Sequence, residues 1–260
     1  MKSFKTLFLF LALALTSSSF TSCSDEDDEP KFANVTLNAG ETKIIDHAAG
    51  IHWTSSNQFV AEMNDNELKA LRVGTATLSS TRGHFKIKVN PTSHLYQDPC
   101  MQFGASQSTV RSWMKSHIPQ AVWKENSKPD LLFYTCTEGA AMIYGYGFDN
   151  KKLSRAMLFV NHRYGDELVT FLTERYIVVT VDEAEGYVGL ISPEKDMLVV
   201  VIPDVLGGVP IYNVVYAPNE ETKGCIDYTK IIQPYTKSAR QTKQSTDAFK
   251  LFTAKMKAAQ

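Results

Sequence analysis

The residues of this 260-residue chain that could do chemistry are few and scattered. The histidines are His47, His52, His84, His94, His117 and His162. None of them has a second ligand type four residues away on a predicted helix face, as a helical metal site requires. The chain also lacks the GxSxG, HExxH and P-loop sequences of common hydrolases and nucleotide-binding enzymes. The sequence therefore assigns no catalytic residue, no metal and no cofactor.

Cysteine offers the strongest nucleophile, and the chain has Cys23, Cys100, Cys136 and Cys225. A catalytic dyad of Cys136 with His162 would arise only if the fold brought the two together. The three cysteines after Cys23 are an odd number, so at least one has no partner within the chain. We prefer a Cys100–Cys225 bridge, which would tie the two ends of the second folded unit. The alternative is three buried thiols that act as small apolar side chains.

A carboxylate cluster, Asp182, Glu183 and Glu185, could supply a general acid and a general base. The cluster lies between two strand-like runs and directly precedes Gly186. Such a position is typical of a solvated hairpin turn. We therefore interpret these carboxylates as turn residues.

An aromatic strand gives the first candidate ligand-binding residues. Tyr144, Tyr146 and Phe148 alternate with glycines, so the three rings share one face of a strand. We favour burial of this face against the core, with a helix close to the glycines, because aromatic area is mostly buried. An exposed strip that stacks on sugar rings is the alternative.

A glycine-rich loop gives the second candidate. Gly207 and Gly208 supply backbone freedom, and Pro203 and Pro210 bound the segment. Loops of this kind often carry binding residues. We therefore predict that Gly207 and Gly208 belong to a loop that adapts to a ligand.

The N-terminus predicts where the protein acts. Two lysines accompany the apolar run 4–15, and small polar residues continue to Ser22. The run is too short for a stable membrane span, so residues 1–22 are predicted to be a cleaved signal peptide. Its end resembles a bacterial lipoprotein signal, which implies that Cys23 becomes a lipid-modified first residue and anchors the chain to a membrane.

An acidic run, residues 24–29, directly follows Cys23. It resembles the export signal that carries lipoproteins of Bacteroidetes to the outer leaflet of the outer membrane. Otherwise it is a solvated linker, and in both cases charge repulsion extends the tether 23–31. We therefore expect a surface-exposed protein of the outer membrane, with the periplasmic face as the alternative.

The charge balance excludes a nucleic-acid-binding class. Loss of residues 1–22 removes two lysines and changes the formal net charge from −1 to −3. The tether alone holds five acidic residues, so the folded body has a formal charge of about +2, and it has no basic stripe. No later apolar run is long enough to span a membrane.

The first folded unit, residues 32–91, has short strand-like runs separated by turns. This pattern is typical of a small all-β sandwich. The segments Trp53–Asn57, Val60–Ala61 and Gly74–Leu78 resemble the bacterial immunoglobulin-like group 2 domain. The resemblance implies a spacer or adhesive module, in which Trp53 fills the core.

The second unit, residues 95–218, reads as a helix followed by an antiparallel meander, twice. Predicted helices begin near Ser106 and Gly165, and the runs between them alternate as strands do. Helices packed on one face of such a sheet form an α+β domain. This order of helices and strands resembles the folds of small periplasmic inhibitor-like and outer-membrane assembly lipoproteins. The resemblance concerns architecture only and implies no functional residues. The polar tail 219–260 ends in an amphipathic helix, which we expect to dock on this unit.

The sequence therefore predicts a multidomain protein, an immunoglobulin-like sandwich followed by an α+β domain. We hypothesise a non-enzymatic binding module for an extracellular glycan or envelope protein. The alternatives are a cell-surface hydrolase with an unrecognised site and a structural component of an envelope complex. A pocket with converging titratable groups would favour the hydrolase, and a flat apolar patch would favour protein docking.

Overall fold

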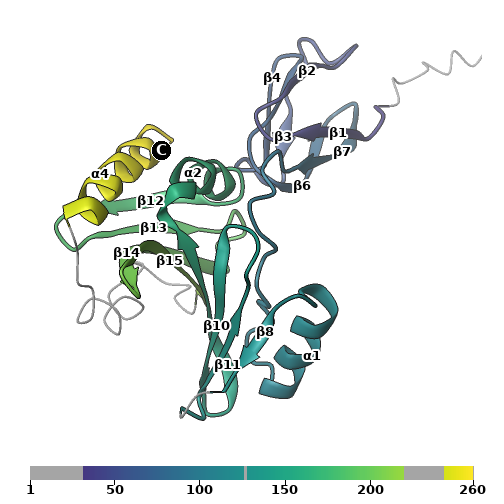
Figure 1. The fold of residues 1–260 in the computed structure, drawn as a ribbon. Helices are drawn as coiled ribbons and strands as arrows, with labels where there is room; N and C mark the ends of the chain where they lie inside the picture. The colour runs from purple at the N-terminus through teal and green to yellow at the C-terminus, as the bar shows by residue number, and fades with distance from the viewer. Residues whose placement is uncertain (1–31, 126–127, 220–242, 260) are drawn as a thin grey trace, which may run out of the picture.

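The computed structural model describes residues 32–125, 128–219 and 243–259 (Figure 1). The predicted signal peptide, Cys23, the acidic tether and Cys225 lie outside these residues. The described part is mostly β-sheet. Its strands form sheets of four, three and eight strands, and β1 and β7 form a parallel pair.

The first unit consists of two small sheets that enclose one core. The sheets have the strand orders β1-β7-β6-β3 and β2-β5-β4. The strands are β1 (Val35–Asn38), β2 (Thr42–Ile44), β3 (Thr54–Ser55), β4 (Ala61–Asn64), β5 (Glu67–Ala70), β6 (Gly74–Ser80) and β7 (Gly83–Asn90). Leu68 of one sheet and Ile87 of the other are both fully buried in the shared core.

The second unit is built on a single antiparallel sheet with the order β12-β13-β14-β15-β11-β10-β9-β8. Its strands are β8 (Val122–Lys124), β9 (Leu131–Thr135), β10 (Ala141–Asp149), β11 (Lys152–Asn161), β12 (Ile177–Asp182), β13 (Tyr187–Ile191), β14 (Met197–Leu206) and β15 (Val209–Pro218). Two meanders of four strands join where β11 pairs with β15.

Helices α1 (Gln107–His117) and α2 (Gly165–Thr173) each precede one meander, and α4 (Lys243–Ala258) follows the second. A short 3-10 helix, His162–Tyr164, leads into α2. Val110 of α1, Phe171 of α2 and Phe252 of α4 all enter the same core with the sheet. The order of helices and strands in the second unit follows the predicted order except for β8, which was not predicted.

The aromatic side of β10 faces this core. Tyr144, Tyr146 and Phe148 are 3%, 0% and 3% exposed, and the Tyr146 hydroxyl donates to the Met114 sulfur of α1 at 3.0 Å. The predicted burial of these rings is therefore confirmed, and the alternative of an exposed aromatic strip is wrong.

In the described part of the chain, the nearest side chains to the glycines of β10 belong to neighbouring strands and not, as was predicted, to a helix. A Cβ atom on Gly145 would lie 3.0 Å from Met157 Cε and 3.1 Å from the Phe133 ring. A Cβ atom on Gly147 would lie 2.6 Å from Arg155 Nε. The glycines therefore make room for side chains of the neighbouring strands β9 and β11.

The last helix docks as expected. Phe249, Phe252 and Met256 of α4 are 6%, 2% and 0% exposed, and the Phe252 ring lies 4.7 Å from the Tyr212 ring of β15. Lys257 pairs with Glu183 of the β12–β13 turn at 2.7 Å. An apolar stripe and a peripheral ion pair thus hold α4 on the second unit (Figure 1).

The two units also contact each other. The backbone N–H of Val73 donates to the carbonyl of Glu174 at 2.6 Å. The Arg72 guanidinium donates to the carbonyl of Tyr176 at 3.2 Å. These contacts join the segment before β6 to the end of α2.

Candidate ligand pocket

The start of α1 positions the candidate site. Ser106 is the N-cap, with an extended backbone, and its Oγ accepts from the Thr109 backbone N–H at 3.3 Å. Before it, Gly104 has φ +86°, a conformation that suits glycine. The backbone of Gly104 and Ala105 exchanges two 2.8 Å hydrogen bonds with Leu153 of β11. A capped helix start is therefore fixed to the edge of the β10–β11 hairpin.

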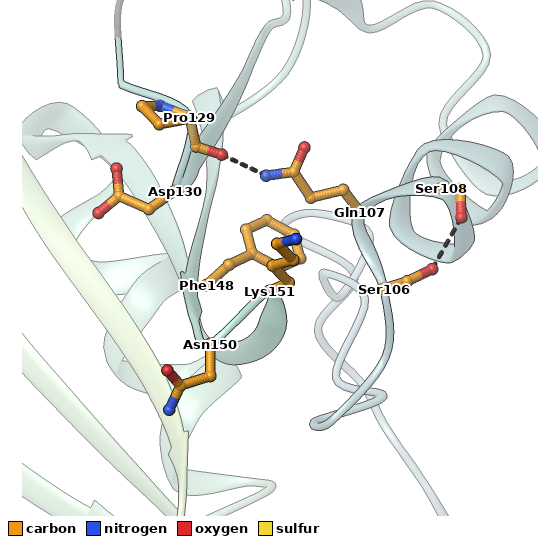
Figure 2. A pocket seen from close by; sticks show the side chains of 8 residues that line it. All are labelled: Ser106, Gln107, Ser108, Pro129, Asp130, Phe148, Asn150 and Lys151. Carbon is orange, nitrogen blue, oxygen red and sulfur yellow. Dashed lines mark hydrogen bonds between the residues drawn. The ribbon is translucent and has the colours of Figure 1, made fainter.

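An open pocket of about 560 Å³ lies at this junction. It is lined by the helix start, the segment before β9 and the β10–β11 turn (Figure 2). The lining residues are Ser106, Gln107, Ser108, Pro129, Asp130, Phe148, Asn150 and Lys151.

Hydrogen bonds hold the walls of the pocket together. The Gln107 side-chain amide donates to the Pro129 carbonyl, so the helix start is tied to the segment before β9 (Figure 2). The backbone N–H of Phe148 donates to the Asp130 carbonyl at 2.8 Å. Two residues of the far wall, Asn150 and Lys151, have φ +50° and +65° and form a two-residue turn between paired strands.

The pocket presents several kinds of polar group beside one aromatic ring. Asp130 offers a carboxylate, Asn150 an amide and Lys151 an ammonium group, and all three residues are exposed. Ser106 and Ser108 add hydroxyls, which lie 2.7 Å apart. Such a lining can hydrogen-bond a polar ligand from several directions, and the nearly buried Phe148 ring forms part of its apolar wall.

Of the predicted binding residues, Phe148 alone lines this pocket. Tyr144 and Tyr146 lie inside the core, where the Tyr144 hydroxyl donates to the Gln97 carbonyl at 3.0 Å. Burial raises the pKa of both tyrosines, so their hydroxyls stay neutral at physiological pH. They support the fold beneath the pocket.

The predicted loop at Gly207 and Gly208 is a tight hairpin turn. β14 and β15 continue past Pro203 and Pro210, and Leu206 pairs with Val209 across the turn. The two glycines have φ +58° and +85°. The prediction of a long adaptable loop is therefore wrong, because both prolines lie within paired strands.

The preferred Cys100–Cys225 bridge involves Cys225, which lies outside the described residues. Cys100 is a free, fully buried thiol, and its backbone N–H donates to the Tyr146 hydroxyl at 3.2 Å. Cys136 is also free, and burial raises its pKa, which disfavours the nucleophilic thiolate. No hydrogen bond links Cys136 to His162 in the described structure, and the Nδ1 atom of His162 is buried without a partner.

The carboxylate cluster is structural, as interpreted from the sequence. The Asp182 carboxylate accepts from the backbone N–H groups of Ala184 and Glu185 at 3.0 and 2.9 Å. Gly186 has φ +75° and leads into β13. These contacts define a side-chain-stabilised turn between β12 and β13.

The expectation that the chain has no Ser-x-x-Lys sequence, which in other proteins pairs a serine nucleophile with a lysine, is wrong, because Ser112–Lys115 and Ser192–Lys195 both have this spacing. Ser112 and Lys115 are exposed on α1, and no hydrogen bond joins their side chains in the described structure. Ser192 is 3% exposed, and its hydroxyl donates to the Asp196 carboxylate at 2.7 Å. Ser192 thus stabilises the turn before β14.

The strongest pKa shifts among the described groups lie in the core. Tyr96 and Tyr216 share a 2.8 Å hydrogen bond between their hydroxyls, and burial raises the pKa of both. Burial also raises the pKa of Asp98, against the opposing effect of Arg175, and one Asp98 oxygen has no hydrogen-bond partner. This cluster lies beneath α2, away from the lining of the α1 pocket.

No group of three His, Cys, Asp or Glu side chains in residues 32–125, 128–219 and 243–259 is placed to bind a metal ion. No helix in the same ranges has the length and apolar character required to cross a bilayer.

The sequence reasoning missed most of the pocket. Gln107, Asp130, Asn150 and Lys151 come from three separate segments, and only the fold brings them together. The capped helix start and the polar turn were both predicted as local structure, but their proximity has no sequence signal. No known protein family matches this chain, and no curated protein is significantly similar to it.

Proposed function

We propose that this chain is a lipid-anchored cell-envelope protein in which an immunoglobulin-like spacer carries an α+β binding domain. The lipid is attached to Cys23, and the acidic tether holds the folded part away from the outer membrane. The α+β domain binds an extracellular ligand without turning it over.

The α1 pocket is the observation that supports this proposal. Its volume of about 560 Å³ lies within the usual range for small-molecule sites. A glycan is the ligand class that fits best, because sugars combine many hydroxyls with weakly apolar ring faces. The Asp130 carboxylate, the Asn150 amide and the Lys151 ammonium group can bind hydroxyls, and the nearly buried Phe148 ring forms part of the apolar lining.

A second candidate function is docking of an envelope protein. Val122 and Trp123 of the edge strand β8 are 55% and 45% exposed, and the Arg111 guanidinium lies 4.4 Å from the Trp123 ring. Exposed Trp and Arg side chains are enriched at protein interfaces, and a free strand edge can accept a strand from a partner.

A glycan array tests the proposal. The mature chain without its lipid is applied to immobilised oligosaccharides of defined structure, beside the variant Gln107→Ala/Lys151→Ala. The matched control is Gln102→Ala/Lys152→Ala, which removes the same groups from exposed positions outside the pocket. We expect binding that the pocket variant loses and the control keeps.

Two other results would contradict the proposal. Retention of an envelope protein that depends on Trp123, with no glycan signal, would favour the docking function. Reproducible hydrolysis of chromogenic glycosides, esters or peptides, abolished by one Asp, Glu, His or Cys substitution in a folded protein, would show an enzyme.

A further inference from the structure

The outward face of the four-stranded sheet in the first unit has an unusual composition. Strand alternation buries Phe85, Ile87 and Val89 of β7 and turns the residues between them to solvent. The other strands alternate in the same way. The resulting outward residues are Thr36, Asn38, Thr54, Thr75, Thr77, Ser79, His84, Lys86, Lys88 and Asn90. This set contains hydroxyls, two amides and basic groups but no carboxylate.

Among the residues that the structure describes, the two lysines of this face have no acidic partner. Lys86 and Lys88 make no ion pair in the described structure. They are two residues apart on one strand, which places their Cα atoms roughly 7 Å apart. At the end of the sheet, the carboxylate of Glu41 accepts from the Asn38 backbone and side chain at 2.7 and 2.9 Å. The centre of the face is therefore positively charged.

The face is also hollowed, with a volume of about 500 Å³. The polar side chains that line it are Asn34, Thr36, Ser56, Thr75, Thr77, Lys86 and Lys88. In the paired strands, Lys88 lies between Thr36 and Thr75. A ligand in this hollow would therefore meet an ammonium group with hydroxyls on both sides.

Two side-chain oxygens in the hollow already accept hydrogen bonds from backbone N–H groups. The Asn34 side-chain oxygen accepts from the Lys86 backbone N–H at 2.8 Å, and the Ser56 hydroxyl oxygen accepts from the Thr77 backbone N–H at 2.9 Å. The Asn34 amide N–H groups and the Ser56 hydroxyl hydrogen remain as donors. Together with two ammonium groups, they make a donor-rich surface that suits an acidic ligand.

We propose that this face binds an anionic polysaccharide through its carboxylate or sulfate groups. A polymer fits because the lysines and hydroxyls extend along a sheet rather than converge on one point. Nucleic acid fits less well, because the residues that line the hollow include no aromatic ring to stack on bases and no arginine fork. The spacer would then be a second binding module, distinct from the α1 pocket.

Affinity measurements with defined polymers test this inference. The mature chain without its lipid is titrated with polygalacturonate and dextran sulfate, with uncharged dextran and oligo(dT) as comparisons. The test variant is Lys86→Gln/Lys88→Gln, and both residues are exposed. The control variant, Lys43→Gln/Lys69→Gln, removes the same charge from the opposite sheet.

We expect an acidic polysaccharide to bind with a salt-sensitive affinity and uncharged dextran not to bind. The test variant should bind about tenfold more weakly with a smaller salt dependence, and the control should match the parent protein. An equal loss in both variants, or no loss in either, would overturn the assignment. Binding of oligo(dT) as tight as that of the polysaccharides would assign the face to nucleic acid instead.

Discussion

The carboxylate of Glu174 accepts hydrogen bonds from both the backbone N–H and the hydroxyl of Thr92. Glu174 ends α2 in the second unit, and Thr92 belongs to the linker after β7. The same carboxylate accepts from the Ser93 backbone N–H at 3.0 Å, and Arg175 donates to the Ser93 carbonyl at 3.0 Å. The linker between the units is therefore fixed by polar contacts.

Loss of this carboxylate should loosen the linker. Glu174 is only 9% exposed, so Glu174→Ala removes three partly buried hydrogen bonds from Thr92 and Ser93 to a charged acceptor and should cost about 1–3 kcal/mol. Hydrogen exchange at the Thr92 and Ser93 amides should accelerate, and the melting temperature should fall. The exposed Glu194→Ala serves as the control. Unchanged exchange in Glu174→Ala would contradict the coupling.

Asp98 should make stability depend on pH. Burial raises the pKa of Asp98 in the folded state, so the folded protein favours the protonated acid. Its contribution to stability is therefore complete below the unfolded-state pKa and is lost as pH rises through the folded-state pKa.

The variant Asp98→Asn removes this titration. Chemical unfolding gives the unfolding free energy of both proteins at pH 4 and at pH 7. The value for the variant minus the value for the parent should be more positive at pH 7 than at pH 4. If this difference is the same at both pH values, the pKa of Asp98 is the same in the folded and the unfolded protein, and the prediction is wrong.

Trp53 should be a core residue of the first unit. Its ring lies 4.8 Å from the Phe32 ring and 5.3 Å from the Phe85 ring, and it is 8% exposed. Trp53→Ala should destabilise the unit by about 3–5 kcal/mol in denaturant unfolding. Trp123→Ala, at a 45% exposed position, should change stability by less than about 0.5 kcal/mol. Equal effects of the two substitutions would refute the core assignment.

Membrane attachment should depend on Cys23. Cys23→Ala removes the thiol that would carry the lipid, so the protein should leave the membrane fraction after cell lysis. The parent protein in the same cells is the control. A variant that stays with membranes although its signal peptide is cleaved would refute lipid anchoring.

Local structure was predictable where a strand or helix has a clear pattern. The helix expected to begin at Ser106 is capped by that residue, and the polar turn at Asn150 and Lys151 joins β10 to β11 as expected. β8 was missed because all three of its residues are exposed and show no alternation. The strands predicted for β14 and β15 were too short, because Pro203 and Pro210 were interpreted as the ends of these strands.

The site was less predictable than the fold. Alternation in β10 placed Tyr146 and Phe148 on one face, but only tertiary packing determined that Tyr146 lies under α1 while Phe148 also reaches the pocket. The boundary between the units showed no shared apolar pattern. The structure joins them instead through single polar residues such as Glu174 and Arg72, which hydrophobic periodicity does not reveal.

Calorimetric titration of the α1 pocket tests the proposed function most directly. The mature chain, the pocket variant Gln107→Ala/Lys151→Ala and the control Gln102→Ala/Lys152→Ala are titrated with the oligosaccharide that gives the strongest array signal. The recovered oligosaccharide is then weighed by mass spectrometry. We predict that only the pocket variant loses affinity, by about tenfold or more, and that the ligand mass is unchanged. Equal affinity of all three proteins, or a cleaved ligand, would contradict the account.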